Sequence, residues 1–215
     1  MQTLSPAHPH YPKRFHDLYD PPKLLYINGD QTLLARPMIA IVGARMATPA
    51  GMHHARVFAQ TLSKAGFLVI SGLARGIDGA AHRACLELGP GFSTIAVCGT
   101  GLDRVYPPEH LNLAQAIAAE GLLISEYQPG VGAKAFHFPR RNRLIAALAL
   151  GVVVIEGAEH SGSLITARLA CELGREVFAL PGAIHHPLNA GCNRLIQEGA
   201  KLANSPKDVL EELLI

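Results

Sequence analysis

Apolar residues along this chain fall into short runs, separated by longer stretches in which they recur with a helical period. Six runs, near residues 39–43, 67–71, 94–98, 122–125, 152–156 and 176–180, have the length and β-branched content of strands. The run Val152–Ile155 shows no polar alternation, as expected for a central parallel strand covered on both faces. The pattern therefore predicts an α/β fold with a doubly wound, mostly parallel sheet and helices on both faces.

Helix boundary signals agree with this prediction. Thr48-Pro49 and Ser205-Pro206 each place a capping hydroxyl before a proline at the first helical position. Glycines at 66, 89, 121, 151 and 174 stand where helices should end. A further strand is expected at Leu24–Ile27, within residues 1–37, which we interpret as an N-terminal extension of a domain covering residues 38–215.

Composition narrows the classes of partner and compartment. The chain has 215 residues, 49% of them apolar, and a net charge of +2, so a site for a polyanion must arise from local clustering of basic residues. The cysteines at 85, 98, 171 and 192 form no Cys-x-x-Cys pair, which predicts buried thiols in a reducing compartment rather than structural zinc. Without an apolar signal core or a spanning segment, we expect a cytoplasmic protein with no metal and no cofactor.

Two of the expected strands end in glycine and are followed by arginine. Gly43 precedes Arg45, and Ser71-Gly72 leads to Arg75. Carboxyl ends of parallel strands form the ligand-binding edge of such sheets, and helix N-termini there favour anions, so these residues predict a phosphate site. Arg45 stands where the second glycine of G-x-G-x-x-G should be, and Ser71 where an acidic residue should be, which argues against an NAD site.

A basic and aromatic cluster lies further along, in a segment expected to be a loop that leads into an apolar helix. Such a mixture suits single-stranded nucleic acid, because cations meet phosphates and rings stack on unpaired bases. The alternatives are that at least one ring packs on the core and that some arginines pair with Glu126 or Glu156. The cluster consists of Lys134, Phe136, Phe138, Arg140, Arg141, Asn142 and Arg143.

A short hydroxyl-rich segment follows the central strand and opens a helix. Backbone amides at such a position can close on a phosphate while hydroxyls donate to its oxygens, although a plain helix cap is the alternative. The residues concerned are Ser161, Gly162, Ser163 and Thr166.

Catalytic constellations are less convincing. Ser71, Asp78 and His82 suggest a triad, but there is no G-x-S-x-G elbow, and we expect Asp78 to cap a helix that begins near Gly76 and His82 to be a structural hydrogen-bonder. Glu126 and Glu156 follow strands and are candidates for a glycosidase-like carboxylate pair. We favour the alternative that each accepts hydrogen bonds from loop N–H groups or pairs with an arginine.

Six motifs occur in order along the chain. They are Ile41–Arg45, Ser71–His82, Gly99–Asp103 with Tyr106-Pro107, Phe138–Arg143, Ser161–Thr166 and Val177–Gly182. Together they closely resemble the DNA-processing protein A family, also known as DprA or Smf. This resemblance implies an extended Rossmann-like fold that binds single-stranded DNA, forms homodimers and loads RecA recombinase onto incoming DNA in natural transformation, without enzymatic activity. By matching motif, the DNA pocket of that family falls on Arg45 and the segment from Lys134 to Arg143.

Two departures and two rival hypotheses accompany the resemblance. Many members carry an N-terminal helical domain and a C-terminal winged-helix-like domain, which we expect this chain to lack, and their Gly-Ser-Arg is Gly-Ala-Arg at residues 43–45 here. One rival is a nucleotide-processing phosphoribohydrolase, but its Pro-Gly-Gly-x-Gly-Thr loop is absent from residues 156–163. The other is an interaction scaffold, whose apolar C-terminal helix around Val209–Leu214 packs on the core or forms a dimer face.

Overall fold

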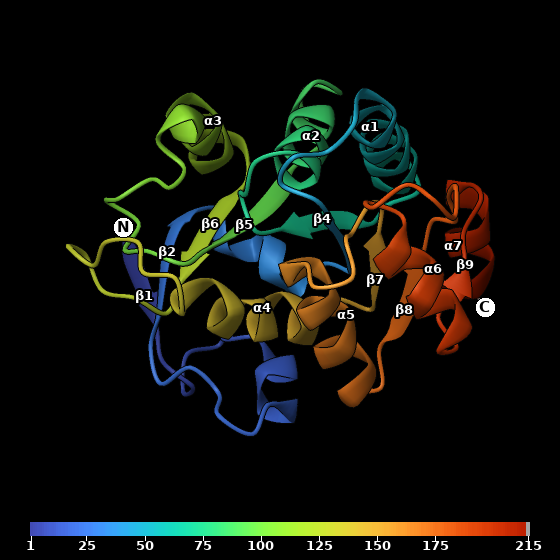
Figure 1. The fold of residues 1–215 in the computed structure, drawn as a ribbon. Helices are drawn as coiled ribbons and strands as arrows, with labels where there is room; N and C mark the ends of the chain where they lie inside the picture. The colour runs from blue at the N-terminus through green and yellow to red at the C-terminus, as the bar shows by residue number, and fades with distance from the viewer. Residues whose placement is uncertain (214–215) are drawn as a thin grey trace.

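A single mixed sheet organises the protein. The computed structural model describes residues 1–213, in which nine strands pair in the order β1-β2-β6-β5-β4-β3-β7-β8-β9 (Figure 1). Strands β3 to β9 run parallel to one another, whereas at one edge β2 is antiparallel to β6 and β1 is antiparallel to β2. The strands are β1 Gln2–Leu4, β2 Leu25–Gly29, β3 Met38–Val42, β4 Leu68–Ser71, β5 Thr94–Cys98, β6 Leu122–Ser125, β7 Gly151–Val154, β8 Glu176–Ala179 and β9 Lys201–Leu202.

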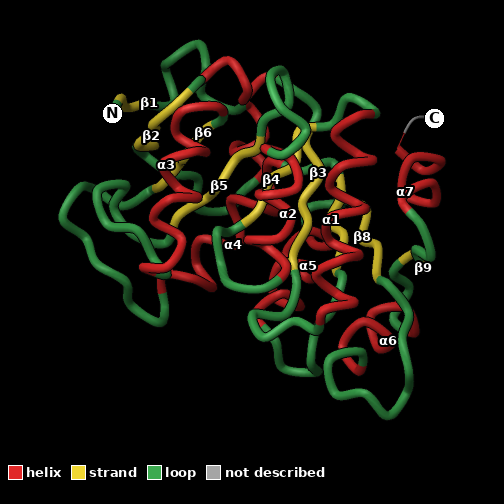
Figure 2. Tube along the Cα trace, turned by 90° about the horizontal axis from the view of Figure 1, so that it is seen from above, coloured by secondary structure: helices red, strands yellow, loops and turns green. Residues whose placement is uncertain are grey.

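Helices cover both faces of this sheet. Helices α1, α2 and α3 lie over one face and α4 and α5 over the other, while α6 and α7 lie toward the β8–β9 end (Figure 1). Seen from above, α7 and β9 stand at the end of the sheet opposite β1 (Figure 2). The helices are α1 Pro49–Lys64, α2 Ile77–Leu86, α3 Leu111–Glu120, α4 His137–Leu148, α5 Gly162–Glu172, α6 Ala190–Gln197 and α7 Pro206–Leu213, with 3-10 turns η1 Lys13–Asp17, η2 Gln31–Ala35 and η3 Pro108–His110.

The doubly wound fold expected from the sequence is confirmed, because each apolar run predicted as a strand became one. The central strands β3, β4, β5, β6 and β7 are buried along their whole length, as strands covered on both faces must be. The Thr48 hydroxyl accepts a hydrogen bond from the Gly51 N–H at 2.9 Å and so caps α1. No helix in the described part of the chain has the length and apolar character needed to cross a membrane.

The C-terminal helix packs on the core. Val209 of α7 is fully buried in the apolar cluster that α1 and α2 form on their face of the sheet, and Leu213 packs against the same cluster. The packing alternative for this helix is therefore confirmed as far as Leu213. Leu214, which the sequence interpretation included, lies outside the described residues.

Three local expectations are wrong. The helix α4 begins at His137, so the segment from Lys134 is a loop only as far as Phe136. Pro139 is tolerated in the first turn of α4 because the N–H groups there have no intrahelical partners. Asp78 does not cap α2, whose N-cap is Gly76; it accepts hydrogen bonds from the N–H groups of Gly72 and Ala74, at 3.1 and 3.3 Å, and so orders the loop after β4. Cys171 is exposed, whereas the other cysteines are buried.

Candidate nucleic-acid interface

The strand order reverses between β3 and β7, which places a crevice at their carboxyl ends. From β3 the chain crosses through α1 to β4 on one side, whereas β7 pairs with the other side of β3. Ligands of open parallel sheets bind at such a point. A pocket of about 70 Å³ lies there, which we call the switch-point pocket. Its lining includes half of the residues predicted as a site, namely Gly43, Arg45, Phe138, Arg141, Asn142, Gly162, Ser163 and Thr166.

Arg45 and Phe138 form one cation–aromatic pair at this pocket. Arg45 is exposed, and its guanidinium carbon lies 5.6 Å from the centre of the Phe138 ring. Phe138 is partly buried because its ring packs against Gly99 and Tyr106. A Cβ added at Gly99 would lie 2.9 Å from the ring, and the centres of the Tyr106 and Phe138 rings are 5.1 Å apart. Phe138 therefore packs against neighbouring residues at the sheet edge, although it belongs to none of the apolar core clusters that the described residues form. Among residues 1–213 no carboxylate lies within ion-pairing distance of Arg45.

Lys134 and Phe136 form a second pair of the same kind just before α4. The Lys134 ammonium lies 6.0 Å from the centre of the Phe136 ring, and that ring is 64% exposed. Within the described chain Lys134 has no carboxylate partner either. Two unpaired cations, each beside an aromatic ring, therefore flank the start of α4.

Arg141 has a different role, because it is only 4% exposed. Its Nη1 donates to the carbonyl of Gly72 at 2.6 Å and to the carbonyl of Val97, which ties the ends of β4 and β5 to α4. Burial lowers the pKa of Arg141, and Asp78 opposes that shift. Burial likewise raises the pKa of Asp78, with Arg141 opposing it, so each group is the other's main compensating charge. Arg141 thus supports the site from within.

Other predicted residues also lie beneath the surface. The Ser71 hydroxyl is fully buried and donates to the carbonyl of Ile41 at 2.6 Å. Gly72 is buried, and an added Cβ there would lie 2.5 Å from Nη2 of Arg141, so only glycine lets that guanidinium approach. Thr166 is 1% exposed. These residues shape the crevice but present little surface to a large ligand.

The start of α5 borders the switch-point pocket. The hydroxyls of Ser161 and Ser163 lie 2.6 Å apart and share a hydrogen bond. Ser161 is the N-cap of α5 but accepts no hydrogen bond from a backbone N–H of the helix, so the capping bond of the plain-cap alternative is not made there. Asn142 donates to the carbonyl of Gly162 at 3.1 Å, which holds α4 against α5. Nothing would contact a Cβ added at Gly162, so space remains beside these N-terminal amides, where an anion is favoured.

The remaining predicted arginines are paired with carboxylates. Arg75 forms an exposed ion pair with Glu109. Arg143, with only 13% of its side chain exposed, donates to Glu126 at 2.6 Å, and Arg140 lies 3.5 Å from the same carboxylate. The alternative that some arginines pair with Glu126 is therefore confirmed, and these side chains contribute less net charge to the edge than their number suggested.

The candidate enzymatic groups are occupied structurally. Glu156 accepts hydrogen bonds from the Thr48 N–H at 2.9 Å and the Thr48 hydroxyl at 2.5 Å, as expected for a carboxylate that orders a loop. His82 is fully buried and bonds to the Thr94 hydroxyl at 2.8 Å, which confirms a structural role. In residues 1–213 no group of three His, Cys, Asp or Glu side chains is placed to hold a metal ion.

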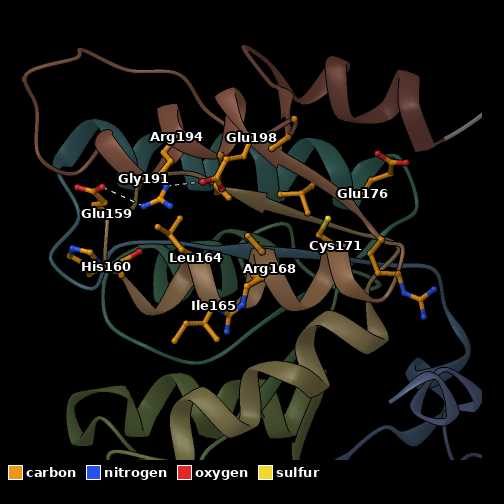
Figure 3. A pocket seen from close by; sticks show the side chains of 17 residues that line it. Glu159, His160, Leu164, Ile165, Arg168, Cys171, Glu176, Gly191, Arg194 and Glu198 are labelled. Atoms are coloured by element: carbon orange, nitrogen blue, oxygen red, sulfur yellow. Dashed lines mark hydrogen bonds and ion pairs between the residues drawn. The ribbon is translucent and has the colours of Figure 1, made fainter. Parts of the chain in front are cut away.

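A larger pocket of about 630 Å³ lies elsewhere, between α5 and α6 (Figure 3). Figure 3 shows the Arg194 guanidinium between Glu159 and Glu198, at 3.4 and 2.7 Å. Arg168 is 3.6 Å from Glu172, so the positive charge here is also compensated. Of the predicted residues only Ser161 lines this pocket, whereas eight line the switch-point pocket.

Comparison with known proteins places the chain among DNA-processing proteins. Residues 2–214 match the family described as DNA recombination-mediator protein A. The chain is 48% identical to DNA processing protein DprA of Streptococcus pneumoniae over 94% of this chain and 71% of that protein. It is 45% identical to protein Smf of Escherichia coli over 94% of this chain, which corresponds to 54% of that relative's length.

Solved structures agree. The S. pneumoniae DNA processing protein A superposes with a TM-score of 0.94 at 46% identity, over 98% of this chain and 74% of that one. DNA processing protein A from Helicobacter pylori, described for its single-stranded DNA binding mode, superposes with a TM-score of 0.89 at 34% identity, over 99% of this chain and 95% of that one. A molybdenum cofactor binding protein from Rippkaea orientalis, at 18% identity and a TM-score of 0.58, shares the fold alone.

Proposed function

Because this chain belongs to the DNA recombination-mediator protein A family, we propose that it binds single-stranded DNA along the carboxyl edge of its sheet and acts as a recombination mediator. The observation that carries the proposal is the presence of two cation–aromatic pairs, Arg45 with Phe138 and Lys134 with Phe136, on either side of the start of α4. Phosphates bind the cations, and unpaired bases stack on the rings. A duplex, whose bases are already stacked, cannot use the rings.

We assign the predicted residues to a contact set and a support set by their burial. Arg45, Lys134 and Phe136 are exposed, so we assign the contacts to them, with the ring of Phe138, the turn at Gly43 and the first turn of α5 forming the crevice behind them. Stacking on an exposed ring such as Phe136 contributes roughly 1–3 kcal/mol per base. The support set holds strand ends and loops in place and consists of Ser71, Gly72, Arg141, Asn142 and Thr166.

Family membership extends the proposal beyond DNA. We propose that the protein acts in the cytoplasm as a homodimer without catalytic activity, loads RecA recombinase onto incoming DNA during natural transformation, and uses residues 38–215 as the DNA-binding domain. Support comes from the family's description as a recombination mediator and from the engagement of Glu126 and Glu156 in structural bonds. The glycine loop of the phosphoribohydrolase alternative is absent from residues 156–163, and Glu126 and Glu156 each accept a structural hydrogen bond.

Fluorescence anisotropy of labelled single-stranded and duplex oligonucleotides, measured at several salt concentrations, tests DNA binding. Wild type should prefer single strands, with log affinity falling against log salt by roughly 0.7 per phosphate contact. Arg45→Ala should weaken binding and flatten that slope by about 0.7. Arg168→Ala is the matched control, because Arg168 is an equally exposed arginine on α5 beside the other pocket. Equal binding of both DNA forms, with Arg45→Ala indistinguishable from wild type, would contradict the proposal.

A further inference from the structure

A second pocket of about 570 Å³ lies against the opposite face of α4 from the switch-point pocket, and the two share no lining residue. Phe138 and Asn142 line the switch-point pocket, whereas Arg140 and Arg143, one turn apart on the other face of the helix, line this one. Its other walls are the chain after β6, Tyr26 of β2 and residues 20–24. A volume of this size is typical of small-ligand sites.

Three buried polar atoms at this pocket have no hydrogen-bond partner among the described residues. They are Oε1 of Glu126, Nη1 of Arg143 and the Tyr127 hydroxyl, and they make up three of the five such side-chain atoms found in residues 1–213. The Glu126 side chain is 8% exposed and is held by Arg143 through its other oxygen. Buried polar groups are nearly always satisfied, so their concentration in one pocket points to a ligand.

Arg140 covers this cluster loosely. Its Nε lies 3.5 Å from Oε1 of Glu126, beyond a good hydrogen bond, and 53% of its side chain is exposed. Rotation of this side chain, which would also break its 3.3 Å hydrogen bond to Asp20, would remove the cation beside Oε1 of Glu126. Lys23, also exposed and at the rim, adds a cation that can meet a phosphate next to the ligand.

The chemistry of the cluster selects among nucleobases. A carboxylate accepts two hydrogen bonds side by side, and guanine alone presents two adjacent N–H donors on its Watson–Crick edge, from N1 and N2. Thymine would turn a carbonyl, and adenine or cytosine a ring-nitrogen lone pair, toward one carboxylate oxygen. The guanidinium of Arg143, beside the carboxylate, is placed to donate to the guanine O6.

We propose that this pocket binds one unpaired guanine base, with Glu126 accepting from N1 and N2, Arg143 donating to O6 and the Tyr127 hydroxyl adding a further hydrogen bond. The inference rests on the proposed function, because the bound DNA strand supplies the base. Val131, which lines this pocket, is three residues before Lys134 in the chain, so a strand bound at Lys134 passes near the pocket. A free guanine nucleotide is the other source of the same base.

The test compares a labelled 20-nucleotide thymidine strand with the same strand carrying one central dG or one central dA. Wild type should bind the dG strand at least about fivefold more tightly than the other two, the discrimination expected of one bidentate base contact. The dA strand controls for purine stacking. Unlabelled dGMP, added as a competitor and titrated alone, reports whether a free nucleotide occupies the pocket.

Two variants assign the preference to the pocket. Tyr127→Phe should reduce the dG preference by at least half without lowering the melting temperature, because the deleted hydroxyl has no partner in the described chain. Glu126→Gln should abolish the preference. Tyr19→Phe, at a fully exposed tyrosine outside the pocket, is the control and should leave it unchanged.

The outcomes separate the two proposals. Equal affinity of wild type for the three strands together with no dGMP binding, or a dG preference that both pocket variants retain, overturns the guanine site while DNA binding stands. Binding of dGMP that Tyr127→Phe weakens, without discrimination among the strands, supports the site and assigns it to a free nucleotide. Failure of every strand to bind overturns the proposed function. In that case dGMP binding supports the guanine site on its own, and no dGMP binding overturns it as well.

Discussion

Replacing Arg141 by methionine separates structural support from DNA contact. The substitution removes the donor to the carbonyls of Gly72 and Val97 and leaves Asp78, 6% exposed, without its compensating cation. Two buried carbonyls left without their donor cost about 1–3 kcal/mol each, and with the loss of the charge that compensates Asp78 the total should be about 3–5 kcal/mol. Since domains are stable by only about 5–15 kcal/mol, a fifth or more of the free energy of unfolding should be lost. The melting temperature should fall by roughly 6–20 °C at this chain length.

Denaturant unfolding measures this loss, and Arg140→Met is the matched control. Arg140 is on the same helix with 53% of its side chain exposed, so its replacement should cost less than about 1 kcal/mol. Adding Asp78→Asn to Arg141→Met removes the buried charge and should recover part of the loss, as a double-mutant cycle would show. Below its melting temperature, folded Arg141→Met should keep the wild-type salt slope of DNA binding, because the guanidinium does not reach the surface.

The opposite pattern would refute this reasoning. If Arg141→Met unfolded at the same denaturant concentration as Arg140→Met, the buried Arg141 guanidinium would contribute little to the free energy of unfolding. If its salt slope of DNA binding also flattened by about 0.7, Arg141 would be a phosphate contact and the division into contact and support residues would be wrong.

Three further changes probe stacking, protonation and close packing. Phe136→Ala should weaken single-strand binding by roughly 1–3 kcal/mol in anisotropy titrations while leaving the salt slope unchanged, since a ring carries no charge; a flattened slope would contradict stacking. Burial lowers the pKa of His82 from 6.5 to about 3, so the folded protein keeps it neutral while the unfolded chain takes up a proton below pH 6.5. The contribution of His82 to the free energy of unfolding is therefore fully present above pH 6.5 and is lost as the pH falls toward 3, by about 2 kcal/mol between pH 7 and 5. Denaturation curves of His82→Gln should lack this pH-dependent loss. A Cβ at Gly43 would lie 2.6 Å from the Ile77 side chain and 2.8 Å from the carbonyl oxygen of Glu156, so Gly43→Ala should lower the melting temperature and weaken DNA binding together; unchanged values of both would show that the crevice can yield.

Local sequence signals predicted the sheet because its determinants are local. Unbroken β-branched runs, such as the one at Val152, can only be central strands, and glycine followed by arginine after a strand falls at the carboxyl edge whatever the loop does. The start of α4 was not predicted because the sequence has no capping signal there: Phe136, the N-cap, makes no side-chain hydrogen bond. Pro139 suggested the end of a helix, although it occupies the first turn of α4. Packing between α4 and its neighbours decides this boundary.

The partners of the arginines could not be predicted from spacing. Arg141 is 69 residues from Gly72 and 44 from Val97, and only the assembled sheet brings those carbonyls to its guanidinium. Arginine is rarely buried, so a basic cluster suggested a charged surface, whereas the structure uses Arg141 inside and pairs Arg143 with Glu126. Within residues 1–213, Arg45 and Lys134 are, apart from the buried Arg141, the predicted basic site residues that have no carboxylate partner, and this depends on the fold rather than on their spacing.

The two outer strands bear on how copies of the protein behave at high local concentration. Exposed sheet edges invite strand addition and aggregation between neighbouring molecules. Here the sheet ends at β1, three residues long, and β9, two residues long, whose Lys201 forms ion pairs with Glu176 and Glu212. Edges this short offer few free amides, so neighbouring copies should stay separate folded units instead of joining into one continuous sheet.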